Sequence, residues 1–149
     1  MAGIIFDDYC VSEASFKKNP NFNPDTQVTL ETNFKCCINI KKEDRLDEVI
    51  ERADVILFCE IGDARNESSP FEVKVTLSGD FVFNPEESDG TKFEKYLSPN
   101  AIAILFPYLR SVIANLTTLS NEFPTLNIPV VNIAEMMLDN ELIEINYID

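Results

Sequence analysis

Apolar and polar residues alternate along most of the first half of the chain, and this period of two predicts β-strands. Because neighbouring side chains of a strand point to opposite faces, each stretch presents one apolar face to a common core. We expect bulges near Tyr9 and at Gly79, where the alternation is interrupted. Residues 19–25 hold two prolines and three asparagines and predict a loop that crosses over between strands. The predicted strands are residues 4–18, 27–42, 49–61 and 71–83.

Residues 43–53 also fit a helix, since Leu46, Val49 and Ile50 fall at i, i+3 and i+4. We favour a strand that begins near Val49, because the alternation of that stretch continues through Val55.

From Ser98 onward the apolar period changes from two to about 3.6, which predicts helices. Ser98 suits an N-cap, and Pro99 suits the first helical position, where no backbone donor is needed. Pro107 lacks the N–H of a continuing helix, so we expect an interruption there and a fresh turn after it. Asn132 can cap a second helix, with Glu135 bonding back to the cap. The first helix carries an apolar stripe formed by Leu109, Val112, Ile113 and Leu116.

Strands that are grouped before helices predict an α+β fold rather than alternating βαβ units. The chain has 149 residues, enough for one buried core, so we expect a single domain over residues 1–149. The predicted architecture is a four-stranded antiparallel sheet followed by a long helix and a shorter C-terminal helix.

The chain is strongly acidic: 12 Lys and Arg residues face 26 Asp and Glu residues, for a formal net charge of −14. Such a field does not attract nucleic acid or anionic membrane surfaces. No apolar run approaches the ~18 residues of a membrane span. After Arg110 the chain has acidic residues but no lysine or arginine. This acidic part is either a solvated surface that aids solubility or an attraction for a basic partner, and the sequence leaves both open.

The residue types that most catalysis and metal binding need are absent or wrongly spaced. The chain has no histidine, so it has no His base and no Ser–His or Cys–His pair. Its cysteines form no CxxC pair, and no glycine-rich phosphate loop occurs. We therefore predict a protein that is not an enzyme and uses no metal or cofactor. No signal peptide is visible, so we expect a cytoplasmic protein with reduced thiols at Cys10, Cys36, Cys37 and Cys59.

The helical part of the chain carries several uncommon residue combinations in a fixed order. They are Asn100, Leu105-Phe106-Pro107-Tyr108, Arg110, Phe123-Pro124-x-Leu126-Asn127 and Pro129-Val130-x-Asn132. In this order and spacing they resemble the SecB export-chaperone family, and the resemblance extends to Ser15-Phe16 and to the proline-rich crossover. It implies the fold predicted above, assembled as a homotetramer (a dimer of dimers). It also implies an ATP-independent cytoplasmic holdase that binds unfolded polypeptides or preproteins for export.

The resemblance also implies a client-binding groove between the crossover loop, the second strand and the C-terminal helix. Methionine side chains there would adapt to varied partners. A core position is the competing interpretation, which we favour for Phe34, Ile133 and Met137, whereas Phe22 stands alone in a polar loop and fits a groove. The side chains that these elements offer are Phe22, Val28, Leu30, Phe34, Ile133, Met136 and Met137.

In SecB, acidic residues on the sheet dock the basic zinc-binding tail of the SecA motor. By resemblance, Glu13 matches one such position, whereas Lys17 and Lys74 stand at two others. Two reversals of charge would weaken the docking of a basic tail. The alternatives to an export chaperone are therefore a chaperone for an antitoxin in a toxin–antitoxin system and a non-enzymatic oligomeric adaptor that binds one folded partner.

Overall fold

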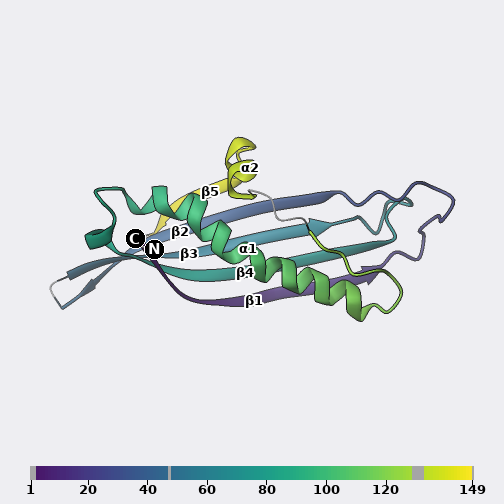
Figure 1. The fold of residues 1–149 in the computed structure, drawn as a ribbon, viewed down its shortest axis with the longest axis horizontal. Coiled ribbons are helices and arrows are strands. Elements are labelled where there is room, and N and C mark those ends of the chain that lie inside the picture. The colour runs from purple at the N-terminus through teal and green to yellow at the C-terminus, as the bar shows by residue number, and fades with distance from the viewer. Residues whose placement is uncertain (1–2, 47, 129–132, 149) are drawn as a thin grey trace.

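The computed structural model describes residues 3–46, 48–128 and 133–148. They form a long, twisted five-stranded sheet with one long helix lying across a single face (Figure 1). A short helix and the last strand lie beside the far side of β2. The elements are β1 (Ile4–Lys18), β2 (Thr32–Arg45), β3 (Glu48–Ile61), β4 (Phe71–Phe83), the 3-10 turn η1 (Pro85–Glu87), α1 (Phe93–Leu119), α2 (Ile133–Asp139) and β5 (Ile143–Ile148).

The strands are ordered β1-β4-β3-β2-β5, and the first four pair antiparallel, as predicted. Buried and half-buried residues alternate along β4, so its buried residues share one face. Strands β2 and β3 pair as far as Arg45 and Glu48, so the helical interpretation of residues 43–53 is wrong. The buried face of the sheet includes Ile38, Val55, Leu57 and Leu77, all fully buried.

Helix α1 packs on this buried face, and Gly79 of β4 permits its close approach. A Cβ atom on Gly79 would lie 2.7 Å from Cδ2 of Leu105, which is fully buried in α1. Glycine is therefore required at this position by the contact between helix and sheet.

The bulge predicted at Gly79 is wrong, because Gly79 pairs in regular register with Tyr9 on one side and Val55 on the other. The register between β1 and β4 is irregular in β1 instead, at two places on either side of Tyr9, near which a bulge was predicted. They fall between Phe6 and Asp8 and between Val11 and Glu13.

Helix α1 begins at Phe93, so the prediction that Ser98 is an N-cap is wrong. Ser98 lies inside the helix, where its Oγ donates to the carbonyl oxygen of Glu94 at 3.3 Å. The helix also continues through Pro99 and Pro107. Phe93 and Leu97 are buried, and their packing on the sheet stabilises the first turns. Tertiary packing thus overrides the local start and stop signals. The predicted cap at Asn132 lies outside the described residues.

The predicted α+β fold is confirmed, with one strand more than expected. After α2 the chain reverses: the N–H of Leu142 donates to the carbonyl oxygen of Met137 at 2.9 Å, and Glu141 adopts a φ of 54°. Strand β5 then pairs with β2 from Cys36 to Lys41, and this pair is the only parallel one within the described ranges.

Candidate functional site

An apolar pocket opens at one end of the sheet, between two loops. One wall is the crossover segment, which we define as residues 19–31, and the other is the post-helix loop, residues 120–128. The start of β4 forms the floor. The pocket, here called the crossover pocket, has a volume of about 360 Å³. Its lining residues are Phe22, Val28, Leu30, Pro70, Phe71, Phe123, Pro124, Thr125 and Leu126.

The crossover segment is held in place by hydrogen bonds to the loop between β3 and β4. Asn19 is buried, and its Nδ2 donates to the carbonyl oxygens of Asn66 and Ser69, both at 2.8 Å. The N–H of Thr29 donates to the carbonyl oxygen of Ser68 at 2.9 Å. These bonds satisfy the polar groups of the segment. Its apolar side chains are left on the pocket side, where Val28 is 54% exposed.

The post-helix loop is held by side chains of α1. The N–H of Leu126 donates to Oγ1 of the buried Thr117 at 2.8 Å. Nε of Arg110 donates to the carbonyl oxygen of Ile128 at 2.7 Å. Two of the residue combinations that resemble SecB, Arg110 and the segment from Phe123 to Asn127, therefore act in shaping one wall of the pocket.

Two aromatic rings that line the pocket, Phe71 and Phe123, pack with a third ring that supports them from β1. The ring of Phe71 on β4 lies 5.1 Å from that of Phe123 and 5.2 Å from that of Phe16 on β1, centroid to centroid. Aromatic packing of this kind makes a firm apolar surface. Phe71 and Phe123 were not predicted as site residues. The combination Phe123-Pro124 was visible in the sequence, but nothing local placed it beside the crossover segment.

The seven predicted groove residues separate into two groups. Phe22, Val28 and Leu30 all line the crossover pocket. The other four lie away from it, toward α2 and the middle of the sheet. Among them Ile133 and Met137 are buried in the core, and Phe34 and Met136 are half-buried against it. The ring of Phe34 meets the ring of Phe106 edge-on at 6.2 Å.

The three residues compared with the SecA-docking positions lie on the sheet face that points away from α1, because they share the face of the half-buried residues that alternate with the buried ones of β4. Glu13 lies opposite Thr76 in the register, and Lys17 lies opposite Glu72. Lys74 lies between Ser15 of β1 and Glu60 of β3. This outer face thus carries both signs of charge around Lys74.

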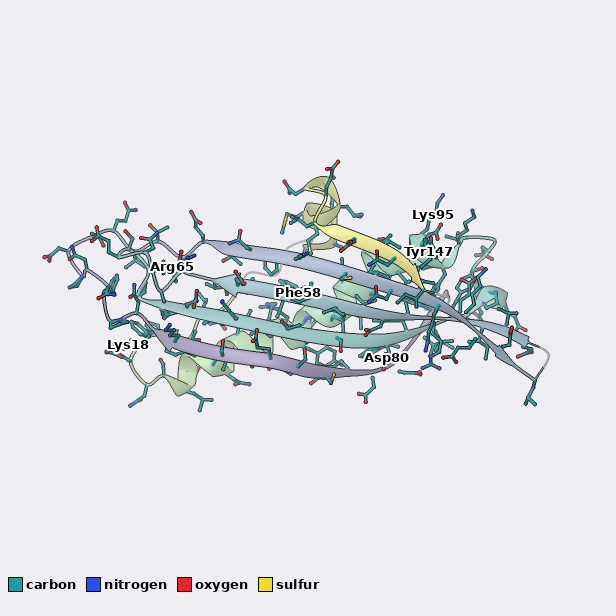
Figure 2. All side chains as sticks on the ribbon, turned by 180° about the vertical axis from the view of Figure 1, so that it is seen from behind. Lys18, Phe58, Arg65, Asp80, Lys95 and Tyr147 are labelled. Carbon is teal, nitrogen blue, oxygen red and sulfur yellow. The ribbon has the colours of Figure 1, made fainter. Side chains whose placement is uncertain are left out.

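Further along the outer face, three aspartates fall in one row across neighbouring strands. Asp8 pairs with Asp80, and Asp80 pairs with Asp54. Burial, and to a smaller extent the charge of Asp80, raise the pKa of the Asp54 carboxyl. The row makes this end of the outer face acidic, and Asp80 is labelled there in Figure 2.

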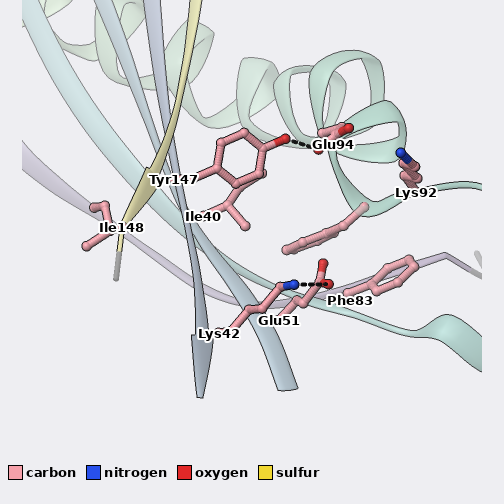
Figure 3. Close-up of a pocket in the computed structure, with 9 residues that line it drawn as sticks. Ile40, Lys42, Glu51, Phe83, Lys92, Glu94, Tyr147 and Ile148 are labelled. Carbon is pink, nitrogen blue, oxygen red and sulfur yellow. Dashed lines mark hydrogen bonds and ion pairs between the residues drawn. The ribbon is translucent and has the colours of Figure 1, made fainter. Parts of the chain in front are cut away.

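A second cavity, of about 770 Å³, lies between β5, the end of β2 and the start of α1 (Figure 3). Tyr147 of β5 reaches across it, and its hydroxyl donates to the carboxylate of Glu94. On the opposite wall Nζ of Lys42 lies 3.9 Å from Oε1 of Glu51. This mixture of charge and apolar surface differs from the crossover pocket.

The two buried thiols, Cys36 and Cys59, are poor nucleophiles. Burial, with a smaller effect of Cys37, raises the pKa of Cys36 to about 12. Burial, with a smaller effect of Glu60, raises the pKa of Cys59 to about 12. A thiol with such a pKa is protonated at neutral pH and is a poor nucleophile. Within the described part of the chain, no group of three or more His, Cys, Asp or Glu residues could hold a metal ion.

The mainly antiparallel sheet, the long helix that covers one of its faces and the apolar crossover pocket define an α+β protein of the SecB-like fold. The family model described as preprotein translocase subunit SecB matches residues 8–141, and the chain therefore belongs to the SecB family. Family membership supports a chaperone role.

Known proteins resemble this chain, in sequence or in fold, at low sequence identity. Uncharacterized protein MJ0357 of Methanocaldococcus jannaschii is 28% identical over 137 residues, which are 91% of this chain and 83% of that protein. The Mycobacterium tuberculosis Rv1957 SecB-like chaperone, solved in complex with a ChAD peptide from the Rv1956 HigA1 antitoxin, has a TM-score of 0.58. It is 15% identical, and the match covers 87% of this chain and 91% of that one. A protein of unknown function from Streptococcus agalactiae has a TM-score of 0.52 at 14% identity, with coverage of 87% and 98%.

Helix α1 is also the one helix in the described ranges that is long and apolar enough to cross a membrane, by length and composition. Its residues Leu97, Leu105 and Leu109 are fully buried against the sheet. Part of this apolar helix surface therefore belongs to the core of the fold.

Proposed function

We propose that the protein is an ATP-independent cytoplasmic holdase that binds extended, apolar segments of unfolded polypeptides. The observation that carries the proposal is the crossover pocket, an almost wholly apolar cavity that opens to solvent between two loops fixed by hydrogen bonds. A soluble protein that keeps such a surface open has a use for it in binding.

The lining of the crossover pocket suits unfolded clients better than a defined small molecule. A specific small ligand is oriented by a few convergent polar groups, whereas eight of the nine lining residues here are apolar and the other is Thr125. Burial of one client Leu or Phe side chain would contribute about 1.5–3 kcal/mol. One such contact is weak. As part of the proposal the chain forms a homotetramer, in which several weak sites on one client add through effective concentration.

A holdase of this kind needs no fuel and no covalent chemistry. By binding the unfolded state and not the native one, it shifts the folding balance of its client by mass action. Release occurs when the client finds a partner or folds. The proposal therefore includes no catalytic residue and no cofactor.

Two versions of the function differ in the destination of the client. In the export version a SecA-like motor docks on the outer face through Glu13 and takes over a preprotein. In the second version the client is an antitoxin. Lys17 and Lys74 favour the second version, because they place positive charge where a basic tail would dock. The Rv1957 chaperone, which has a similar fold, is solved with an antitoxin peptide.

Reversing the charge of two residues distinguishes the export version from the antitoxin version. Replacing Lys17 and Lys74 together by glutamate should strengthen binding of a basic SecA tail peptide if that tail uses this face. Titration calorimetry with the unaltered protein and the double variant measures the change. Equal, undetectable binding by both proteins would exclude the export version and leave the antitoxin version.

The proposal itself is tested by aggregation of a chemically unfolded client diluted into buffer without ATP. Stoichiometric protein should slow the rise of turbidity, and Val28→Asp should reduce this effect by placing a charge in the pocket. Val49→Asp is the matched control, since Val49 is similarly exposed, at 62%, on the distant end of β3. No slowing by the unaltered protein, even in excess, would reject the holdase function.

A further inference from the structure

Strand β5 pairs with β2 on the side opposite β3. This edge of β2 starts near the crossover pocket and runs away from it along the sheet. We propose that β5 is a displaceable strand that holds this edge in place of a client segment and is released when a client binds. The inference rests on the proposed holdase function and deepens it, because it defines where a client pairs and what it must displace.

The crossover pocket and the edge of β2 follow one another along the chain. Leu30 lines the pocket, β2 begins at Thr32, and pairing with β5 begins at Cys36. The described part of the chain places no other strand beside residues 32–35 on that side. At ~3.3 Å per residue, these four residues offer about 13 Å of edge. A client segment that leaves the pocket and pairs along β2 therefore meets β5 after about four residues.

The sequence of β5 has the pattern that an extended client would offer. Ile143, Ile145 and Tyr147 alternate with Glu144, Asn146 and Ile148. The first set lies opposite Cys36, Ile38 and Ile40 of β2, which are buried on the α1 side of the sheet. The strand thus presents only apolar side chains inward and mainly polar ones outward, as a bound segment of an unfolded protein would.

The packing of β5 is loose compared with that of the inner strands β2, β3 and β4, which carry several buried residues each. None of its six residues, all of which the structure describes, is buried. Ile145 is 38% exposed and Tyr147 is 63% exposed, although both project from the inner side. The cavity of about 770 Å³ in Figure 3 lies behind them, between β5 and the start of α1. Release of β5 therefore uncovers little apolar surface that is now buried, and such weakly packed elements open most readily.

Besides the backbone ladder with β2, a few polar side-chain contacts hold the strand in place. The hydroxyl of Tyr147 donates to Glu94 of α1, at the end of β5. Nδ2 of Asn146 donates to Oδ1 of Asn39 at 3.2 Å and contacts Sγ of Cys37 at 3.5 Å. At the start of β5, the turn after α2 keeps the strand attached to the core. The strand can therefore swing away from β2 while its first residue stays tethered.

Cys37 provides a native reporter of this movement. Its side chain lies on the outer face beneath Asn146, so a docked β5 shields it and a released β5 exposes it. In a Cys10→Ser background, the rate of Cys37 alkylation measures the release of β5. Tyr147→Phe removes the donor of the contact at the end of the strand, and Glu94→Gln removes the charge of its acceptor, so each should raise that rate several-fold. A client peptide should raise it as well.

The decisive experiment locks β5 to β2. Asn39 and Asn146 are register partners whose side chains touch, so Asn39→Cys with Asn146→Cys can form a disulfide. The background is Cys10→Ser and Cys37→Ser, and the reduced form of the same protein is the matched control. The probe is a labelled peptide of alternating apolar and polar residues, about 15 residues long, which spans the pocket and the edge at ~3.3 Å per residue. Oxidation should weaken peptide binding at least about tenfold, because the competent state is no longer populated.

The outcomes separate the two claims. If oxidised and reduced proteins bind the peptide equally and slow client aggregation equally, β5 is not displaced and this inference fails while the holdase function stands. If neither form slows aggregation, and the unaltered protein does not either, the holdase function fails and the inference fails with it. Weaker binding on oxidation, restored by reduction, supports both.

Discussion

Nε of Arg110 donates a 2.7 Å hydrogen bond to the backbone carbonyl oxygen of Ile128, and this bond joins the end of the post-helix loop to α1. A charged donor of this kind contributes about 1.5–3 kcal/mol. Arg110→Met keeps the length of the side chain and removes its donors. We expect a lower free energy of unfolding by about that amount and weaker client binding, because one wall of the crossover pocket loses its support.

Urea denaturation and the aggregation assay measure these two effects of Arg110→Met. Arg65→Met is the control, since the Arg65 side chain is 93% exposed and its ion pair with Asp63 should contribute little. Identical behaviour of the two variants would show that the Arg110 bond does not support the pocket.

Replacement of Gly79 by alanine tests the close approach of α1 to the sheet. The new Cβ would lie 2.7 Å from Cδ2 of Leu105, which is fully buried and has little room to move. Gly79→Ala should lower the free energy of unfolding by about 1–3 kcal/mol, the usual cost of overpacking. Denaturant unfolding measures the loss. Ser78→Ala, one residue away on the outer face, should change it by less than about 0.5 kcal/mol.

Asp54 gives a pH dependence of definite sign. Burial and the charge of Asp80 raise its pKa in the folded protein above the ordinary value of 3.8. The folded state therefore binds the proton more tightly than the unfolded state does, and stability falls as the pH rises above 3.8. Asp54→Asn should raise the free energy of unfolding at pH 7. This gain should vanish near pH 3, where the Asp54 carboxyl of the unaltered protein is protonated in both the folded and the unfolded state.

Thermal unfolding from pH 3 to pH 7 follows the Asp54→Asn effect. The control is Asp25→Asn, at an exposed position of the crossover segment. If the stability gain of Asp54→Asn persisted unchanged at pH 3, its cause would be something other than the ionisation of Asp54.

Three of the four thiols, Cys10, Cys36 and Cys59, should divide by burial when the native protein is titrated with an alkylating reagent. Cys10 is exposed and should react first. Cys36 and Cys59 are buried, and burial raises the pKa of each to about 12, so they should stay unmodified until the protein unfolds. Mass spectrometry of the digested protein identifies the modified sites. Early modification of Cys59 would show that the buried face of β3 is accessible.

The first four strands could be predicted from sequence because their alternation is local. The start of α1 could not, since Ser98 and Pro99 carry the local signals of a helix start and lie inside α1. The reason is physical: buried Phe93 and Leu97 stabilise the earlier turns by packing, which no local signal reports.

Strand β5 and half of the crossover pocket lay beyond sequence reasoning for a related reason. The alternation from Ile143 to Ile148 is visible in the sequence, but a pattern of six residues does not show which strand edge of the sheet it will pair with. Phe22 could be identified because it stands alone in a polar loop. Phe71 and Phe123 could not, since only the folded chain brings their rings to 5.1 Å of each other.

The two prolines inside α1 also bear on the order in which the chain folds. Each removes a backbone donor, so α1 on its own is a poor helix and needs the finished sheet as a surface to form on. That sheet joins the start of the chain to its middle, with Ile4 beside Phe83, and pairing over such separations is slow. During synthesis β1 stays without its partner strand until β4 has left the ribosome. A protein proposed to protect unfinished chains therefore passes through a long unfinished state of its own.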